Sequence, residues 1–243
     1  MFESTLPFGT PDLIRVSAYR RYLDETSRSG DGDVGTSRLS SLNPSLAEDL
    51  MRFEQARKPG VGLELLEVMA ACVRHSRSLL LQLQEAERVV PLTVFPSERL
   101  VHCPLRLETL LAGRLTDLQV MHVEPAVLRP PGHPDLSLVG DPDAYAPLGP
   151  LLWELAMRGA RDELLPEISG MAAYRISPGL DLFGLNLSGS MAAAVERLKR
   201  ATTNLREISE WPGFDRTRAI RLLNGLYLQA GLMVTRTHPA AKA

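Results

Sequence analysis

The sequence predicts an α+β protein in two parts, and three observations support this prediction. Residues 1–124 give helical and strand-like segments in an irregular order, with two consecutive strands between helices. The C-terminal quarter instead gives three helical segments followed by one strand. The charge also changes, because residues 188–243 carry nine Lys and Arg against four Asp and Glu, a net of +5, whereas residues 1–187 carry −7. We therefore expect a sensory or adaptor-like α+β domain over residues 1–187 and a separate module over residues 188–243.

The composition is that of a soluble globular protein of the bacterial cytoplasm. The chain has 243 residues, of which 44% are hydrophobic and 23% charged, and its net charge of −2 argues against non-specific polyanion binding by the whole chain. Two cysteines make no disulfide framework, and the start of the chain has no signal-peptide pattern. No apolar run approaches the roughly 20 residues that span a bilayer. The 24 Arg against 3 Lys are typical of a GC-rich bacterial genome.

The first part of the chain begins with predicted helices. One helix opens at Pro11, and a mobile loop rich in Ser, Gly and Asp follows over residues 27–44. Ser45 and Glu48 form a capping box that starts a second helix. Residues 63–88 are expected to form the longest helix of the chain, with apolar residues at spacings of three and four. Two interpretations of that stripe remain open: the core face of a helix on a sheet, which we favour, or a dimer seam.

Strands and a proline-rich segment follow. Residues 88–95 and 98–103 predict a hairpin around Pro96 and Ser97, and a short helix comes after it. Residues 117–124 have apolar side chains on both faces, which is typical of a strand inside a sheet. The proline-rich segment 125–150 is expected to be extended and at the surface, and Pro150 is expected to start another helix.

The C-terminal module has clear local signals at each boundary. We expect a helix over residues 191–200, a short helix capped by Asn204, and a tight turn at Trp211–Phe214. Asp215 is expected to cap a third, longer helix, which ends before Gly231 and is followed by a strand.

This order of elements resembles the winged helix-turn-helix modules of bacterial regulators. The resemblance covers only this module, and it rests on element lengths and turn residues rather than on a diagnostic string. It implies that the third helix is a DNA recognition helix. The possible nucleic-acid contacts are then Arg216, Arg218 and Arg221 near its start, and Arg236 in the strand that follows.

A different interpretation of the third helix is packing against the chain or a partner. Its apolar residues are more numerous than one buried face needs, whereas a recognition helix must keep its outer face polar. Leu222, Leu226 and Leu228 lie around the cylinder, and Gly225 permits a close backbone approach. We favour this interpretation, with the three leucines as possible contacts to a protein partner or to a second copy of the chain.

The few cysteines and histidines give no complete metal site. Cys72 and His75 lie near one another in sequence and could join His102 and Cys103, but neither pair has the Cys-x-x-Cys spacing of a zinc knuckle. A hydrolytic site around His122 and His133 remains a remote alternative, without a second ligand motif downstream.

The sequence therefore predicts a non-catalytic regulatory or adaptor protein that acts through protein–protein interaction. We expect no enzyme activity, no cofactor, no metal and no membrane partner. The alternative is a DNA-binding transcriptional regulator that uses the C-terminal module.

Overall fold

A computed structural model describes residues 13–29, 44–55, 63–182, 184–185 and 187–241, so most of the expected mobile loop at 27–44 lies outside the described residues. Helices and strands both contribute, in agreement with the α+β class. The chain divides into two compact units, Met1–Leu148 and Gly149–Ala243. This division comes earlier than the predicted boundary at residue 187. The reason is that strand β7 (Ala173–Ile176) pairs with β8 (Thr203–Asn204) and β9 (Leu232–Thr235), far along the chain.

The N-terminal unit is organised around a six-stranded antiparallel sheet in the order β1-β5-β2-β3-β4-β6. The predicted hairpin around Pro96 and Ser97 is confirmed, because β3 pairs with β4. The predicted interior strand is also confirmed, because β5 lies between β1 and β2. The strands are β1 (Leu63–Glu64), β2 (Leu79–Glu85), β3 (Arg88–Phe95), β4 (Leu100–His102), β5 (Gln119–Pro125) and β6 (Tyr145–Pro147).

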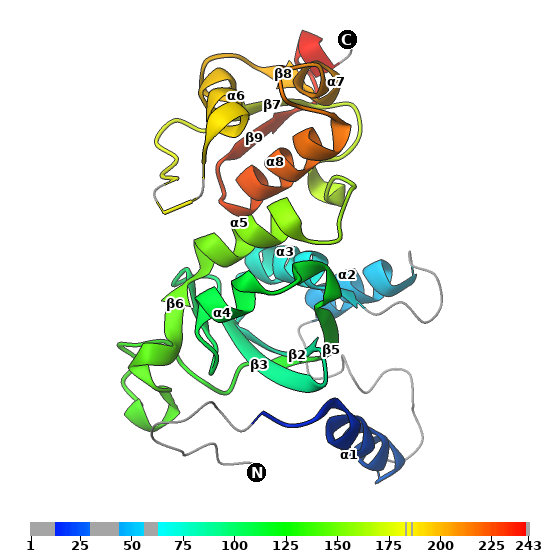
Figure 1. Cartoon of the computed structure of the whole chain (residues 1–243), viewed down its shortest axis with the longest axis vertical. Coiled ribbons are helices and arrows are strands. Elements are labelled where there is room, and N and C mark those ends of the chain that lie inside the picture. The colour runs from blue at the N-terminus through cyan, green and yellow to red at the C-terminus, as the bar shows by residue number, and fades with distance from the viewer. Residues whose placement is uncertain (1–12, 30–43, 56–62, 183, 186, 242–243) are drawn as a thin grey trace. The chain divides into compact units, whose positions relative to one another are not determined.

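Helices cover both faces of this sheet (Figure 1). On one side lies α3 (Leu65–His75), which is buried along most of its length and packs against α2 (Pro44–Gln55). On the other side, α1 (Val16–Ser29) packs Val16 and Tyr19 against Val89 of β3, with Met121 of β5 beside them. The alternation of side chains along the strands makes both contacts possible.

The predicted long helix over residues 63–88 is wrong. Helix α3 ends at His75, because Ser76 adopts a left-handed conformation with φ of 49°, and β2 follows. Leu79, Leu81 and Leu83 are buried at alternating positions of that strand. Leu79 and Leu83 had fitted a helical stripe, since an alternating run also supplies apolar residues four positions apart. With the helix gone, the interpretation of the stripe as a dimer seam has no structural basis.

The connection between β4 and β6 contains α4 (Leu107–Ala112), strand β5 and the proline-rich segment. Tyr145 of β6 holds that segment in place: its hydroxyl donates to the Arg129 carbonyl at 2.6 Å and accepts from the Gly140 N–H at 2.9 Å. The ring of His102 lies edge-on to Tyr145, and burial lowers the pKa of His102.

Short 3-10 turns occur at Leu115–Asp117, Leu136–Leu138, Pro142–Ala144, Pro166–Ile168 and Pro239–Ala241.

The C-terminal unit packs helices onto a three-stranded antiparallel sheet with the order β8-β7-β9 (Figure 1). Helix α8 is its central helix. From Ala219 onward only Arg221 and Tyr227 of that helix are partly exposed. Gly225 permits α5 to approach closely, as predicted, because a Cβ there would lie 3.0 Å from the Trp153 ring. The helices of the unit are α5 (Leu148–Arg158), which starts at the boundary, α6 (Gly189–Arg200), α7 (Leu205–Ser209) and α8 (Arg216–Leu228).

A buried amide fixes α8 against the chain that precedes the sheet. Asn224 is only 1% exposed. Its Oδ1 accepts from the Leu165 N–H at 2.9 Å, and its Nδ2 donates to the Glu163 carbonyl at 2.9 Å. Both ends of the amide are therefore satisfied by backbone groups, as a buried polar side chain requires.

We predict that Asn224→Ala destabilises the C-terminal unit by about 2–3 kcal/mol, because the buried Leu165 N–H loses its acceptor. Urea unfolding followed by tryptophan fluorescence measures this, since both tryptophans of the chain, Trp153 and Trp211, belong to this unit. Ser169→Ala is the control: it removes an exposed hydrogen bond to Pro166 and should change the free energy of unfolding by less than about 0.5 kcal/mol. Equal effects of the two changes would contradict the role given to Asn224.

Candidate interaction surface

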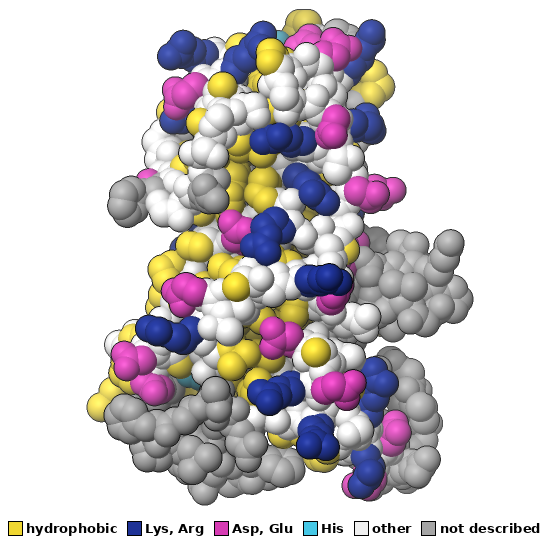
Figure 2. Space-filling view, in the orientation of Figure 1, with side chains coloured by type: hydrophobic (Ala, Val, Ile, Leu, Met, Phe, Trp, Pro, Cys, Tyr) yellow, Lys and Arg dark blue, Asp and Glu magenta, His cyan; other side chains and the backbone are white. Residues whose placement is uncertain are grey.

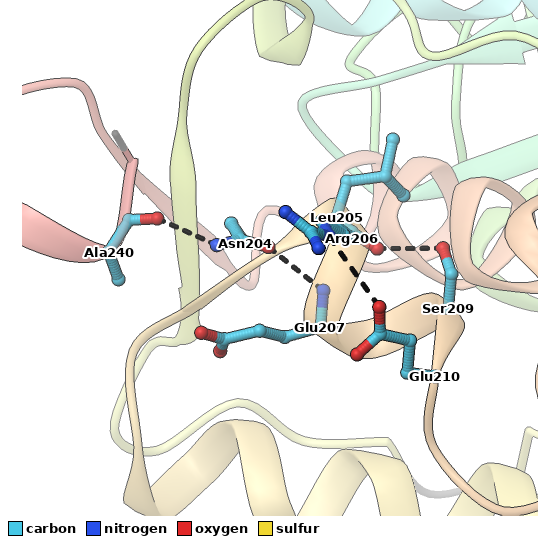
Figure 3. Close-up of polar contacts among 7 residues, drawn as sticks. All are labelled: Asn204, Leu205, Arg206, Glu207, Ser209, Glu210 and Ala240. Carbon is cyan, nitrogen blue, oxygen red and sulfur yellow. Dashed lines mark hydrogen bonds and ion pairs between the residues drawn. The ribbon is translucent and has the colours of Figure 1, made fainter. Parts of the chain in front are cut away.

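The short helix α7 is placed by a hydrogen-bonded cap at its start (Figure 3). Asn204 Oδ1 accepts from the Glu207 N–H at 2.9 Å, so the predicted cap is confirmed, and Nδ2 of the same side chain donates to the Ala240 carbonyl at 2.8 Å. The Asn204-x-x-Glu207 spacing also predicts a capping box in which Glu207 accepts from the Asn204 N–H; this half of the prediction is wrong, because the Glu207 carboxylate instead accepts from the Thr203 hydroxyl. Asn204 thus ties α7 to the last turn of the described chain.

A tight turn then leads from α7 into α8. The Phe214 N–H donates to the Trp211 carbonyl at 2.9 Å, and Gly213 has φ of +76°, a conformation that favours glycine. A Cβ on Gly213 would also lie 3.0 Å from the Ser190 side chain, so the turn is seated against the start of α6. Asp215 caps α8 as predicted, with Oδ1 accepting from the Arg218 N–H at 2.7 Å.

Two arginines stack on the aromatic side chains of this turn. The Arg197 guanidinium lies 4.7 Å from the centre of the Trp211 ring, and the Arg218 guanidinium lies 5.5 Å from that of Phe214. The two rings meet edge to face with centres 6.3 Å apart. We call this row of four side chains, Arg197, Trp211, Phe214 and Arg218, the arginine–aromatic surface. Both arginines are exposed and both rings are partly exposed.

A hollow of about 410 Å³ borders this surface and shares Arg218 with it. Ser188 caps α6 by position, yet its hydroxyl makes no cap hydrogen bond. The Nε atom of Arg221 is buried, and no described residue accepts a hydrogen bond from it. The hollow is lined by Ser188 and Met191 at the start of α6, by Asp215, Thr217, Arg218 and Arg221 at the start of α8, and by Met157 of α5.

The arginines predicted to contact DNA have different surroundings. Arg216 and Arg218 are exposed on the first turn of α8, whereas Arg221 is partly buried; Arg218 and Arg221 line the hollow and Arg216 does not. Arg236 is not part of the hollow either: its guanidinium donates to the Glu167 and Ser169 carbonyls, at 3.2 Å each. Lys and Arg side chains are interspersed with Asp and Glu over the described part of the face that Figure 2 shows, and they form no continuous basic stripe there.

The three leucines predicted to bind a partner are core residues. Leu222, Leu226 and Leu228 are each 0% exposed. Because they are enclosed by the chain itself, they leave no surface for a partner or for a second copy, and this site prediction needs correction. The excess of apolar residues on the third helix indicated instead that the helix is enclosed on several sides.

The cysteines and histidines considered for zinc lie in separate places. Cys72 is buried and its thiol donates to the Arg77 carbonyl at 2.9 Å, whereas His75 Nε2 lies 2.5 Å from Asp49 Oδ2. The His102 ring lies edge-on to that of Tyr145. His133 Nδ1 accepts from the Asp135 N–H. The described residues contain no group of three or more His, Cys, Asp or Glu side chains that could hold a metal ion.

Of the arginine–aromatic surface, only Arg218 was singled out from the sequence, as a possible nucleic-acid contact. Trp211 and Phe214 were assigned to a turn, and Arg197 belongs to the end of the predicted helix over residues 191–200, so these assignments did not indicate a shared surface. The residue types could have indicated this surface, since Trp, Phe and Arg are enriched in protein interfaces. The separation of these residues along the sequence conceals the surface, because Arg197 comes close to Trp211 only in the folded unit, where α7 leads the chain back toward α6.

Comparisons of the chain with protein-family models, with curated proteins and with solved structures found no match. Within the described residues, no helix is both long enough and apolar enough to cross a membrane.

We predict that neither cysteine reacts with a thiol reagent at pH 8 in the folded protein. Burial raises the pKa of Cys72 to about 12 and that of Cys103 to about 11, so both thiols stay protonated and enclosed. Ellman's reagent should titrate two thiols in denaturant and none without it. Because these pKa values rise on folding, the thiols contribute stability below the ordinary pKa of 9.0 that is lost as the pH rises toward 11–12. Rapid labelling of the native protein would contradict the assignment of both residues to the core.

Proposed function

We propose that this chain is a non-catalytic regulatory or adaptor protein that binds an acidic segment of another protein through its arginine–aromatic surface. We also propose that the protein acts in the bacterial cytoplasm, and this is supported by its two cysteines, which are buried and form no disulfide. The stacked row of Arg197, Trp211, Phe214 and Arg218 is the observation that carries the proposal.

The chemistry of this row suits a protein partner. Tryptophan and arginine supply most binding hot spots, because they combine a large apolar area with directed polar groups. The Trp211–Phe214 turn is braced by a backbone hydrogen bond and by its contact with α6, so little order has to be gained on binding. Charge selects the partner: residues 149–243 carry twelve Lys and Arg against nine Asp and Glu, a net of +3, and acidic segments complement it.

A specific observation favours DNA as a second candidate. The order α6, α7, α8 and β9 supports the proposed winged-helix likeness, and Arg216 and Arg218 are exposed where a recognition helix begins. Two features weigh against it. Helix α8 is covered beyond its first turn, so most of it has no face to lay in a major groove. Strand β9 pairs with β7, which precedes α6, rather than with a following strand in a wing hairpin.

The protein-binding proposal is tested by selecting phage-displayed random peptides on the full chain and measuring their affinities by calorimetry. We expect peptides that carry acidic residues beside apolar ones, with binding weakened at least about ten-fold by Arg197→Gln and by Trp211→Ala, as for hot-spot residues. Arg175→Gln is the matched control: it removes an exposed arginine of β7 that is not part of the surface. Failure to enrich any peptide, or equal affinity for wild type and both surface variants, would overturn the proposal.

The DNA candidate is tested by fluorescence anisotropy of the full chain with random and genomic duplexes across a salt series. If DNA is the partner, affinity falls steeply with salt, because each phosphate contact releases counterions. Replacing Arg216 and Arg218 by Gln should then reduce both affinity and salt slope, whereas Arg175→Gln should leave them unchanged. Flat anisotropy at micromolar protein removes this candidate and leaves the protein-binding proposal standing.

A further inference from the structure

The hollow beside the arginine–aromatic surface contains an arginine with one buried N–H that makes no hydrogen bond within the described residues. Arg221 is partly buried, its Nε atom is enclosed, and no described residue accepts a hydrogen bond from that atom. A guanidinium has N–H donors and no acceptor, so an enclosed Nε–H without an acceptor carries a free-energy cost. Removing that cost requires a ligand oxygen together with a small shift of the side chains that enclose the Nε atom.

The other polar groups of the hollow favour the same kind of ligand. Arg218 lines it from the same side of α8, three residues before Arg221. The hydroxyls of Ser188 and Thr217 are further potential donors. The one acidic group, Asp215, already accepts the Arg218 N–H in the helix cap, and the two arginines leave the hollow with a net positive charge.

Two methionines complete the lining of the hollow. Met157 and Met191 form part of the wall, where their flexible side chains can adjust to an occupant. Carboxylate and phosphate oxygens match the fork of N–H groups that a guanidinium presents.

We infer that this hollow is an oxyanion-binding subsite, in which Arg221, assisted by Arg218, holds a carboxylate or phosphate group of the bound partner segment. The inference rests on the proposed function, because it names the chemical group that the partner inserts next to the arginine–aromatic surface. Arg197 lies outside the hollow and contributes only to the aromatic row.

The test is an NMR titration of the full chain labelled with ¹⁵N-arginine, which reports each Nε–H separately. Inorganic phosphate and acetate are added in turn at constant ionic strength, with chloride as the reference anion. We expect a saturable shift of the Arg221 Nε–H signal with at least one oxyanion and none with chloride. Arg221→Gln should weaken binding, followed at the Arg218 signal, at least about ten-fold. Arg197→Gln, the control outside the hollow, should leave it unchanged.

Each outcome decides the inference. Saturation with phosphate alone supports a phosphorylated partner segment, and saturation with acetate supports acidic side chains. Shifts that fail to saturate, that appear equally with chloride, or that survive Arg221→Gln overturn the subsite. The peptide selection separates this failure from that of the proposed function: peptides that lose affinity with Trp211→Ala but not with Arg221→Gln would keep the surface and discard the subsite.

Discussion

Helix α8 has thirteen residues, and eight of them are buried. The rest of the C-terminal unit depends on enclosing these residues while leaving the charged side chains of the helix in contact with solvent. A helix enclosed on several sides can keep charged side chains only near its ends, and here they all lie in the first two turns, at Arg216, Arg218 and Arg221. The buried amide of α8, Asn224, is tolerated because the Leu165 N–H and the Glu163 carbonyl pair with its two ends. Core packing and the position of the charged surface are thus two results of one constraint.

The arginine–aromatic surface shows how a fold can keep arginines available while fixing where they are. Stacking over Trp211 and Phe214 restrains Arg197 and Arg218 without using the hydrogen-bond donors of either guanidinium. By contrast, the Arg236 guanidinium donates hydrogen bonds to the Glu167 and Ser169 carbonyls. The difference separates arginines that hold the unit together from arginines that can still bind something else.

Local signals in the sequence predicted local structure well, and failures arose where distant residues decide the outcome. The caps at Asn204 and Asp215 and the hairpin around Pro96 follow from neighbouring residues alone. The helix predicted over residues 63–88 failed because Leu79 and Leu83 satisfy both periods, and only pairing with β3 and β5 selects the strand. The domain boundary and the arginine–aromatic surface both require contacts between segments separated by other elements, which no single window of sequence contains.

The last strand of the six-stranded sheet has a consequence for how this protein behaves at high concentration. The backbone N–H of Cys103 donates to the Ala144 carbonyl, and that of Leu148 donates to the Arg99 carbonyl. In this antiparallel register the backbone groups of Tyr145 and Pro147 point away from β4. Pro147 has no N–H to offer there, and the strand is only three residues long. A foreign strand therefore meets a short edge that lacks an N–H donor at Pro147, which disfavours edge-to-edge aggregation of the kind that leads to amyloid at β6.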